Sequence, residues 1–274
     1  MRLAVLINTC DKFADCWEPF CTLWAQYGVP NSRLYLNTER ADFAFAGLDI
    51  VPLNVCTAHE WNAKRPPAWG WCTARALEAI DADIILYMQE DYFLNTPADA
   101  ARIAELVQLM ERERSIDCIH LTECGITRTE PCEYEGLLRG RKDDDCFASL
   151  QAALWRKSTM QALLLEHESG WDWEYHAARR AKKRNCGFYV AAPQAGRYPM
   201  SYLFTGIIQG KWYRPVVELF AAHGINVDFS SRGFYEGPFG RKEGRVLAYH
   251  LCHLRACWVT FCMKFLNFRS MRAR

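Results

Sequence analysis

The stretch Asp81-Ala-Asp-Ile-Ile-Leu-Tyr-Met-Gln-Glu-Asp-Tyr-Phe-Leu94 is the most informative part of the chain, because an apolar run leads directly into adjacent carboxylates. Apolar residues at 84–88 are typical of a strand that is covered on both faces. Glu90 and Asp91 follow at its carboxyl end, the edge where open α/β sheets bind ligands. Their oxygens suit Mg²⁺ or Mn²⁺. The stretch predicts a buried strand with a metal site at its tip, formed mainly by Asp91 and also by Glu90.

Other apolar runs of strand length lie on both sides of this one, at residues 3–8, 33–37, 48–53, 116–121, 147–155 and 187–192. Stretches of helical length and composition lie between or after them, at residues 72–80, 96–114, 157–167, 172–185 and 213–223. Thr96 is expected to be an N-cap, with Pro97 in the first helical position. Residues 122–146 lack periodicity and predict a long loop that crosses the sheet edge. The alternation predicts an α/β fold with a mostly parallel central sheet flanked by helices.

Composition limits the class of protein. Half of the 274 residues are apolar, which is enough for a substantial core. Thirty-three basic against 32 acidic residues give a net charge of +1, so a broad nucleic-acid-binding surface is not expected. Thirteen scattered cysteines without a C-x-x-C pair favour a reduced, cytoplasmic protein. No run of about 18 uncharged apolar residues indicates a membrane-spanning helix.

The C-terminal segment has an unusual charge pattern. Residues 255–274 contain five basic and no acidic residues, and aromatic residues interleave with the basic ones. This pattern fits a helix in the headgroup layer of an anionic membrane, which would bring the protein to the inner face of the cell membrane. It fits equally well a helix that packs on the body of the protein and ends in a frayed basic tail.

A second group of acids lies in Glu168-Ser-Gly-Trp-Asp-Trp-Glu-Tyr-His176, near the start of a predicted helix. Carboxylates there gain about 0.3–1 kcal/mol from the helix dipole, so Asp172 and Glu174 have a structural explanation. The two flanking tryptophans favour a chemical one. Aromatic walls desolvate a carboxylate, raise its pKa and offer apolar faces to a sugar ring.

Residues 83–94 resemble the strand and acidic DxD signature of GT-A-fold glycosyltransferases, with Gln89 in place of the first acid. The resemblance implies a GT-A-like, Rossmann-type sheet and a Mn²⁺ or Mg²⁺ ion, held by Asp91 and Glu90 against the diphosphate of a nucleotide sugar, most simply a UDP-sugar. Gln89 is expected to hydrogen-bond the ribose. Residues 8–12 are similar to the nucleoside-binding edge of these enzymes, which implies donor contacts for Thr9 and Asp11.

Three further elements resemble parts of bacterial surface-glycan glycosyltransferases. Residues 69–77 look like the helix start that carries an arginine near the diphosphate, here Arg75. Gly210-Lys-Trp212 is similar to an element that places Lys211 beside the leaving diphosphate, at a helix N-terminus. For both cations, an ordinary solvated surface residue is an equally good interpretation. Residues 168–176 resemble an acceptor-side element, which implies that Glu174, or else Asp172, removes the proton of the acceptor hydroxyl in an inverting reaction.

The sequence thus predicts a glycosyltransferase that moves a sugar from a nucleotide diphosphate donor to a hydroxyl of a glycan or glycolipid. Residues 1–212 are expected to form the catalytic domain, and residues 213–274 a helical C-terminal extension with the basic aromatic tail. Two other possible metal sites are weaker. Asp143-Asp-Asp145 matches DxD literally but lies among basic residues in a loop, and His250 and His253 form only an isolated H-x-x-H.

Three other classes of protein compete with this interpretation. A dinucleotide-binding Rossmann enzyme is excluded, because no glycine follows the first strand. A metal-dependent phosphoesterase usually gathers several acids or histidines around two metals, and only one strand tip here is strongly acidic. A non-catalytic protein that binds nucleotide sugars or glycans stays open, and Gln89 is its best support.

Overall fold

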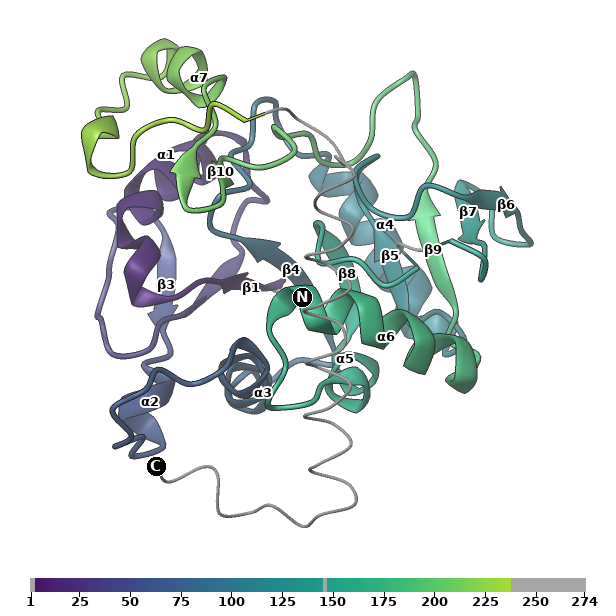
Figure 1. Cartoon of the computed structure of the whole chain (residues 1–274). Coiled ribbons are helices and arrows are strands. Elements are labelled where there is room, and N and C mark those ends of the chain that lie inside the picture. The colour runs from purple at the N-terminus through teal and green to yellow at the C-terminus, as the bar shows by residue number, and fades with distance from the viewer. Residues whose placement is uncertain (1–2, 145–146, 238–274) are drawn as a thin grey trace.

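The computed structural model describes residues 3–144 and 147–237, in which nine strands form one sheet with the order β3-β2-β1-β4-β8-β5-β9-β7-β6 (Figure 1). The strands are β1 (Ala4–Asn8), β2 (Arg33–Asn37), β3 (Asp49–Pro52), β4 (Ile84–Gln89), β5 (Cys118–His120), β6 (Thr129–Pro131), β7 (Leu137–Gly140), β8 (Ala153–Arg156) and β9 (Phe188–Ala191). Only β8 and β7 run against both of their neighbours, and all other pairs are parallel. The predicted mostly parallel α/β sheet is therefore confirmed.

Helices cover both faces of this sheet (Figure 1). On one face lie α1 (Trp17–Tyr27), α4 (Ala100–Arg112) and α7 (Val216–Ala222), and on the other lie α3 (Trp69–Ala79), α5 (Lys157–Leu163) and α6 (Gly170–Arg184). Shorter elements are the 3-10 helices η1 (Asp11–Cys16) and η2 (Phe229–Ser231), helix α2 (Val55–Ala58) and the hairpin of β10 (Ile207–Ile208) and β11 (Lys211–Trp212).

Strand β4 explains why the sheet has two covered faces. Leu86 and Met88 point into the core beneath α1 and α4, whereas Ile85 and Tyr87 point into the core beneath α3 and α6. All of its residues from 84 to 88 are buried. Side chains of a strand alternate between faces, so a continuous apolar run is what a doubly covered strand requires.

The order β3-β2-β1-β4 matches the first half of the doubly wound Rossmann fold. The chain leaves β1 toward β2 and β3, and then returns to place β4 on the other side of β1. In open α/β sheets, ligands bind outside the carboxyl ends of the strands at such a reversal. Glu90 and Asp91 directly follow β4 and therefore lie at this switch point.

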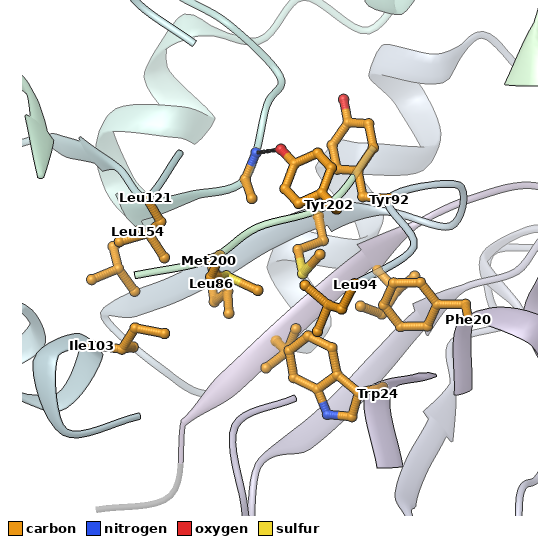
Figure 2. Close-up of a cluster of buried hydrophobic side chains, with 14 of the residues drawn as sticks. Phe20, Trp24, Leu86, Tyr92, Leu94, Ile103, Leu121, Leu154, Met200 and Tyr202 are labelled. Carbon is orange, nitrogen blue, oxygen red and sulfur yellow. Dashed lines mark hydrogen bonds between the residues drawn. The ribbon is translucent and has the colours of Figure 1, made fainter. Parts of the chain in front are cut away.

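A polar network crosses the core beside β4. Tyr92 and Tyr202 stack with their ring centroids 4.7 Å apart. The Tyr202 hydroxyl accepts from Ala152 N at 3.0 Å (Figure 2) and donates to Gln151 Oε1 at 2.9 Å. The Gln151 amide in turn donates to the Tyr92 hydroxyl, which donates to Leu150 O. The network ties the segment before β8 to the chain that leaves β4.

Several predicted boundaries need correction. The predicted loop 122–146 contains the antiparallel hairpin β6–β7, which extends the sheet, and the predicted strand 147–155 begins only at Ala153. The helices predicted at 157–167 and 213–223 are shorter, because α5 ends at Leu163 and α7 begins at Val216. Helix α6 begins before residue 172, at Gly170, because Ser169 forms a capping box with Asp172.

The start of α4 also differs from the prediction. Its N-cap is Asp99, whose Oδ1 accepts from Arg102 N at 2.9 Å, and Thr96 lies outside the helix. We expect Asp99→Ala to lower the free energy of unfolding by about 1 kcal/mol, because one backbone donor loses its partner. Urea unfolding measures this, with Thr96→Ala as the control. A larger loss from Thr96→Ala than from Asp99→Ala would contradict this assignment of the cap.

Some predictions fall outside the described residues, namely His250, His253, Asp145, the basic tail 255–274 and most of the C-terminal extension. In residues 3–144 and 147–237, none of the helices is long and apolar enough to cross a bilayer. The cysteines within these ranges are all free thiols.

Candidate active site

The carboxyl edge of the sheet gathers polar side chains from three parallel strands. Asn8 of β1 is in register with Asn37 of β2 and with Gln89 of β4. Asn8 Oδ1 accepts from Asn37 Nδ2 at 2.9 Å and from Thr73 Oγ1 of α3 at 3.2 Å. Helices α3 and α6 both begin at this edge. Helix α3 leads into β4 and helix α6 leads into β9, and these two strands run in the same direction.

Asp91 anchors a distant part of the chain over this edge. Its Oδ2 accepts from the Thr205 hydroxyl and from Ile207 N at 3.1 Å, and its carbonyl accepts from Gly206 N at 2.9 Å. Its Oδ1 is buried and has no hydrogen-bond partner. One oxygen thus holds the segment that precedes the β10–β11 hairpin, and the other is left for a further ligand.

Burial dominates the electrostatics of the two acids. Glu90 is 8% exposed and Asp91 6%. Burial raises the pKa of Glu90 well above its usual range, and the charge of Asp91 raises this pKa further. Burial also raises the pKa of Asp91, although the hydrogen bonds from Thr205 and Ile207 oppose the increase. Two adjacent carboxyl groups that are costly to ionise favour a cation beside them.

The two acids fit a divalent cation of a particular kind. They offer hard oxygen donors, including the unpartnered Asp91 Oδ1. Residues 3–144 and 147–237 contain no cluster of three or more His, Cys, Asp or Glu side chains that could enclose a metal by themselves. Mg²⁺ is commonly held by one or two carboxylates, with water and substrate phosphates as the other ligands. Glu90 and Asp91 suit a cation of that type, which arrives with a phosphorylated ligand.

Arg232 is a cation at this site that sequence reasoning missed. Its side chain is 10% exposed and forms a bidentate ion pair with Asp15, with both N–O distances 2.5 Å. It also donates to Lys12 O at 2.8 Å and stacks on Phe13. Its positive charge acts to lower the pKa of Glu90, against the larger effect of burial. No motif surrounds Arg232 in the sequence, and only the fold brings it to η1.

Lys211 lies on β11 and not at a helix N-terminus, which corrects the predicted setting of this residue. The β10–β11 hairpin turns at Gln209 and Gly210, both with positive φ, as a two-residue type I′ turn requires. Gly210 O accepts from Arg232, and the hairpin begins at the segment held by Asp91. Lys211 is exposed in this hairpin, whereas Trp212 is buried in the core.

Glu174 joins the same site from α6. Its Oε1 accepts from Leu150 N at 2.8 Å and from the Ser149 hydroxyl at 3.4 Å. Burial raises its pKa above the usual range, although both hydrogen bonds oppose this. The charges of Glu90 and Glu174 both raise the pKa of the Tyr87 phenol, beyond the larger effect of its burial. The charges of the two predicted acid groups, 84 positions apart in the sequence at Glu90 and Glu174, thus both act on this one buried side chain.

Asp172 has a different surrounding. Its Oδ2 accepts from Ser169 N at 3.1 Å and from the Ser169 hydroxyl at 2.7 Å, which completes the capping box of α6. Asp172 therefore stabilises the start of α6, and Glu174 is the stronger candidate for a general base.

Three residues predicted to contact the donor hold local structure. Thr9 accepts from Trp17 Nε1 at 2.9 Å. The Asp11 carboxylate accepts three backbone N–H groups of residues 39–41, after β2. Arg75 lies within α3, where its guanidinium pairs with Glu166 at 2.7 Å and with Glu78 at 3.2 Å. Thr9 and Asp11 do lie at the carboxyl edge of the sheet, where their backbone groups can contact a donor.

The triple-aspartate segment serves the β6–β7 region. Asp144 is 2% exposed, and its Oδ2 accepts from Thr127 N, Thr127 Oγ1 and Arg128 N. Asp143 pairs with Arg141 at 2.9 Å, which lowers the pKa of Asp143. Both described acids of this segment thus have structural partners.

The sequence matches no protein-family model and no curated protein. Solved structures with a similar chain path include S. aureus TarS 1-349, which is 9% identical with a TM-score of 0.45 over 98% of this chain and 75% of that chain. Another is 2-C-methyl-D-erythritol 4-phosphate cytidylyltransferase from Thermus thermophilus, 13% identical with a TM-score of 0.45 over 82% of this chain and 100% of that chain.

A third is glucosyl-3-phosphoglycerate synthase from Mycobacterium tuberculosis, solved in complex with Mn²⁺, uridine-diphosphate and phosphoglyceric acid. It is 14% identical with a TM-score of 0.43, over 88% of this chain and 81% of that chain. Similarity at this level of identity and TM-score does not assign a reaction or a ligand.

Proposed function

We propose that the protein is a glycosyltransferase that moves a sugar from a nucleotide diphosphate donor, such as a UDP-sugar, to a hydroxyl group of a glycan or glycolipid. One observation carries the proposal: Glu90 and Asp91 follow β4 at the switch point of the sheet, and the charge of Glu174 on α6 acts on Tyr87 and Tyr92, the side chains on which the charges of Glu90 and Asp91 also act. This arrangement offers carboxylates for a cation and a separate carboxylate that is suited to proton transfer.

The donor diphosphate is assigned to the side of the edge formed by β1, η1 and the segment 205–232. Lys12 and Lys211 are exposed there, and Arg232 is held between Asp15 and the hairpin. Positive charge on this side stabilises the negative charge that develops on a leaving nucleoside diphosphate. Glu90 and Asp91 Oδ1 would hold Mg²⁺ or Mn²⁺ on the same phosphates. When bound, the cation would offset part of the leaving-group charge.

Glu174 is assigned to the acceptor. Its raised pKa brings its proton affinity closer to that of a base working near neutral pH. Leu150 N and Ser149 hold one carboxylate oxygen, so the other is available to accept the proton of an incoming hydroxyl. The Tyr92–Gln151–Tyr202 network fixes residues 150–152, and hence the position of this carboxylate.

The proposal is tested by incubating the protein with UDP-glucose, UDP-galactose and UDP-N-acetylglucosamine, with Mn²⁺ or with EDTA, and by measuring released UDP. Glycosyltransferases slowly pass the donor sugar to water when the acceptor is absent, so we expect Mn²⁺-dependent UDP release from at least one donor. Calorimetric titration with UDP and Mn²⁺ accompanies the assay. Binding without release would favour a non-catalytic nucleotide-sugar-binding protein, and the absence of both would refute the proposal.

A further inference from the structure

Trp171 is a large apolar side chain that the core does not use. It is 82% exposed, whereas its neighbour Trp173 is fully buried between Trp69 and Trp155, with ring centroids 5.8 Å and 5.9 Å away. The two tryptophans that flank the acids of α6 therefore differ in role. Trp173 holds the helix on the sheet, and Trp171 offers its ring to solvent.

The position of Trp171 connects it with the site. It precedes Glu174 by three residues on α6, and side chains three apart lie on the same face of a helix. Helix α3 begins beside α6, where Gly70 N donates to Glu168 O at 2.9 Å. The exposed ring of Trp171 therefore lies about one turn of α6 from the proposed base.

The charges around Trp171 select among ligands. The acids nearest to it on α6 are Asp172 and Glu174, whereas Glu168 is 1% exposed and forms a bidentate pair with Arg180. An anionic ligand is disfavoured at such a place, whereas Lys12, Lys211 and Arg232 favour one on the opposite side of Glu90. A neutral ring with many hydroxyl groups suits the α6 side, because its C–H face stacks on an indole and its hydroxyls donate to carboxylates.

We propose that Trp171 is the platform of the acceptor subsite and stacks against a neutral pyranose ring whose hydroxyl faces Glu174. This inference rests on the proposed function and adds to it the chemical class and the side of the acceptor. The donor and the acceptor then approach the carboxylates from opposite sides, the donor over η1 and the acceptor over the start of α6.

Fluorine NMR of the full chain labelled with 5-fluorotryptophan tests the inference. The resonance that disappears in Trp171→Phe belongs to Trp171. The probes are the methyl glycosides of glucose, galactose, mannose and N-acetylglucosamine at millimolar concentration. We expect at least one of them to shift the Trp171 resonance in a saturable way, and Trp171→Ala to weaken binding of that probe about fivefold to tenfold by saturation-transfer NMR. Glu111→Ala, an exposed change on α4, is the control and should leave the affinity unchanged.

Two outcomes would overturn the inference: no glycoside shifts the Trp171 resonance, or the glycoside that does so binds Trp171→Ala as tightly as the parent protein. Titration with UDP and Mn²⁺ in the same samples separates this failure from failure of the proposed function. Normal UDP binding without a glycoside effect refutes the platform alone. A glycoside effect without UDP binding supports the platform and refutes the transferase.

Discussion

Glu174→Gln should lower kcat by about 10²-fold to 10⁴-fold, the usual contribution of a positioned general base. The glutamine oxygen can still accept from Leu150 N, so the packing of α6 against residues 149–150 should persist. Only the ability to take a proton is lost. Initial rates of UDP release with saturating donor and acceptor measure the effect, and calorimetry with UDP and Mn²⁺ should show donor affinity within about twofold of the parent protein.

The pH dependence of kcat provides a second measurement of the same group. A base acts in its ionised form, so kcat should rise with pH through the pKa of Glu174. Burial raises this pKa, which moves the rise above the pH where an exposed glutamate would titrate. In Glu174→Gln the rise should disappear from the profile.

Asp172→Asn is the matched control, because it removes a carboxylate two residues away on the same helix. The Asp172 side chain completes a capping box with Ser169, so we expect a loss of up to about 1 kcal/mol in stability and a kcat within about twofold of the parent protein. A greater loss of kcat from Asp172→Asn than from Glu174→Gln would transfer the role of base to Asp172.

The central sheet was predictable because its signals are local. The apolar runs ending at Asn8, Asn37 and Gln89 are continuous and short, which is the pattern of buried parallel strands. The β6–β7 hairpin was missed because its strands lie at the sheet edge. Only a few of their side chains are buried, so no apolar pattern distinguishes them from a loop.

The candidate site was predictable only in part, for a related reason. The acidic residues Glu90, Asp91 and Glu174 stand out against apolar or aromatic neighbours, and in the fold their charges act on Tyr87 or Tyr92. Thr205 and Arg232 have no such local signal. They reach Asp91 and Asp15 across separations of 114 and 217 residues, which depend on how the chain after β9 returns over the sheet.

Glu90→Gln should make the protein more stable at neutral pH and at the same time remove its response to Mn²⁺. Burial raises the folded-state pKa of Glu90 above its unfolded value. The group therefore contributes full stability below the unfolded pKa, and this contribution is lost as pH rises toward the folded pKa. Each unit by which the pKa is raised corresponds to about 1.4 kcal/mol at higher pH. Glutamine avoids this cost because it never ionises.

The measurement is urea unfolding of both proteins at several pH values between pH 5 and pH 8, above the pH at which a glutamate of the unfolded chain ionises. The stability advantage of Glu90→Gln should widen as pH rises, and Glu111→Gln, an exposed change on α4, should show no such trend. An advantage that stays constant with pH would contradict the assignment of the cost to ionisation of Glu90.

The same variant tests whether the buried carboxylate of Glu90, which lowers the stability of the fold at neutral pH, is needed to bind a ligand. If its carboxylate is kept ionised to hold a cation with a diphosphate, UDP with Mn²⁺ should raise the Tm of the parent protein and leave that of Glu90→Gln almost unchanged. The affinity of Glu90→Gln for UDP with Mn²⁺ should be reduced by at least about 10²-fold.

Asp91→Asn is the complementary change, because an amide oxygen can still accept from Ile207 N while the charge is removed. Asp91→Ala would also release the segment 205–207, so loss of activity in that variant alone would not identify a metal ligand. If UDP and Mn²⁺ stabilise the parent protein, Glu90→Gln and Asp91→Asn equally, then Glu90 and Asp91 have a structural role only and do not hold a cation.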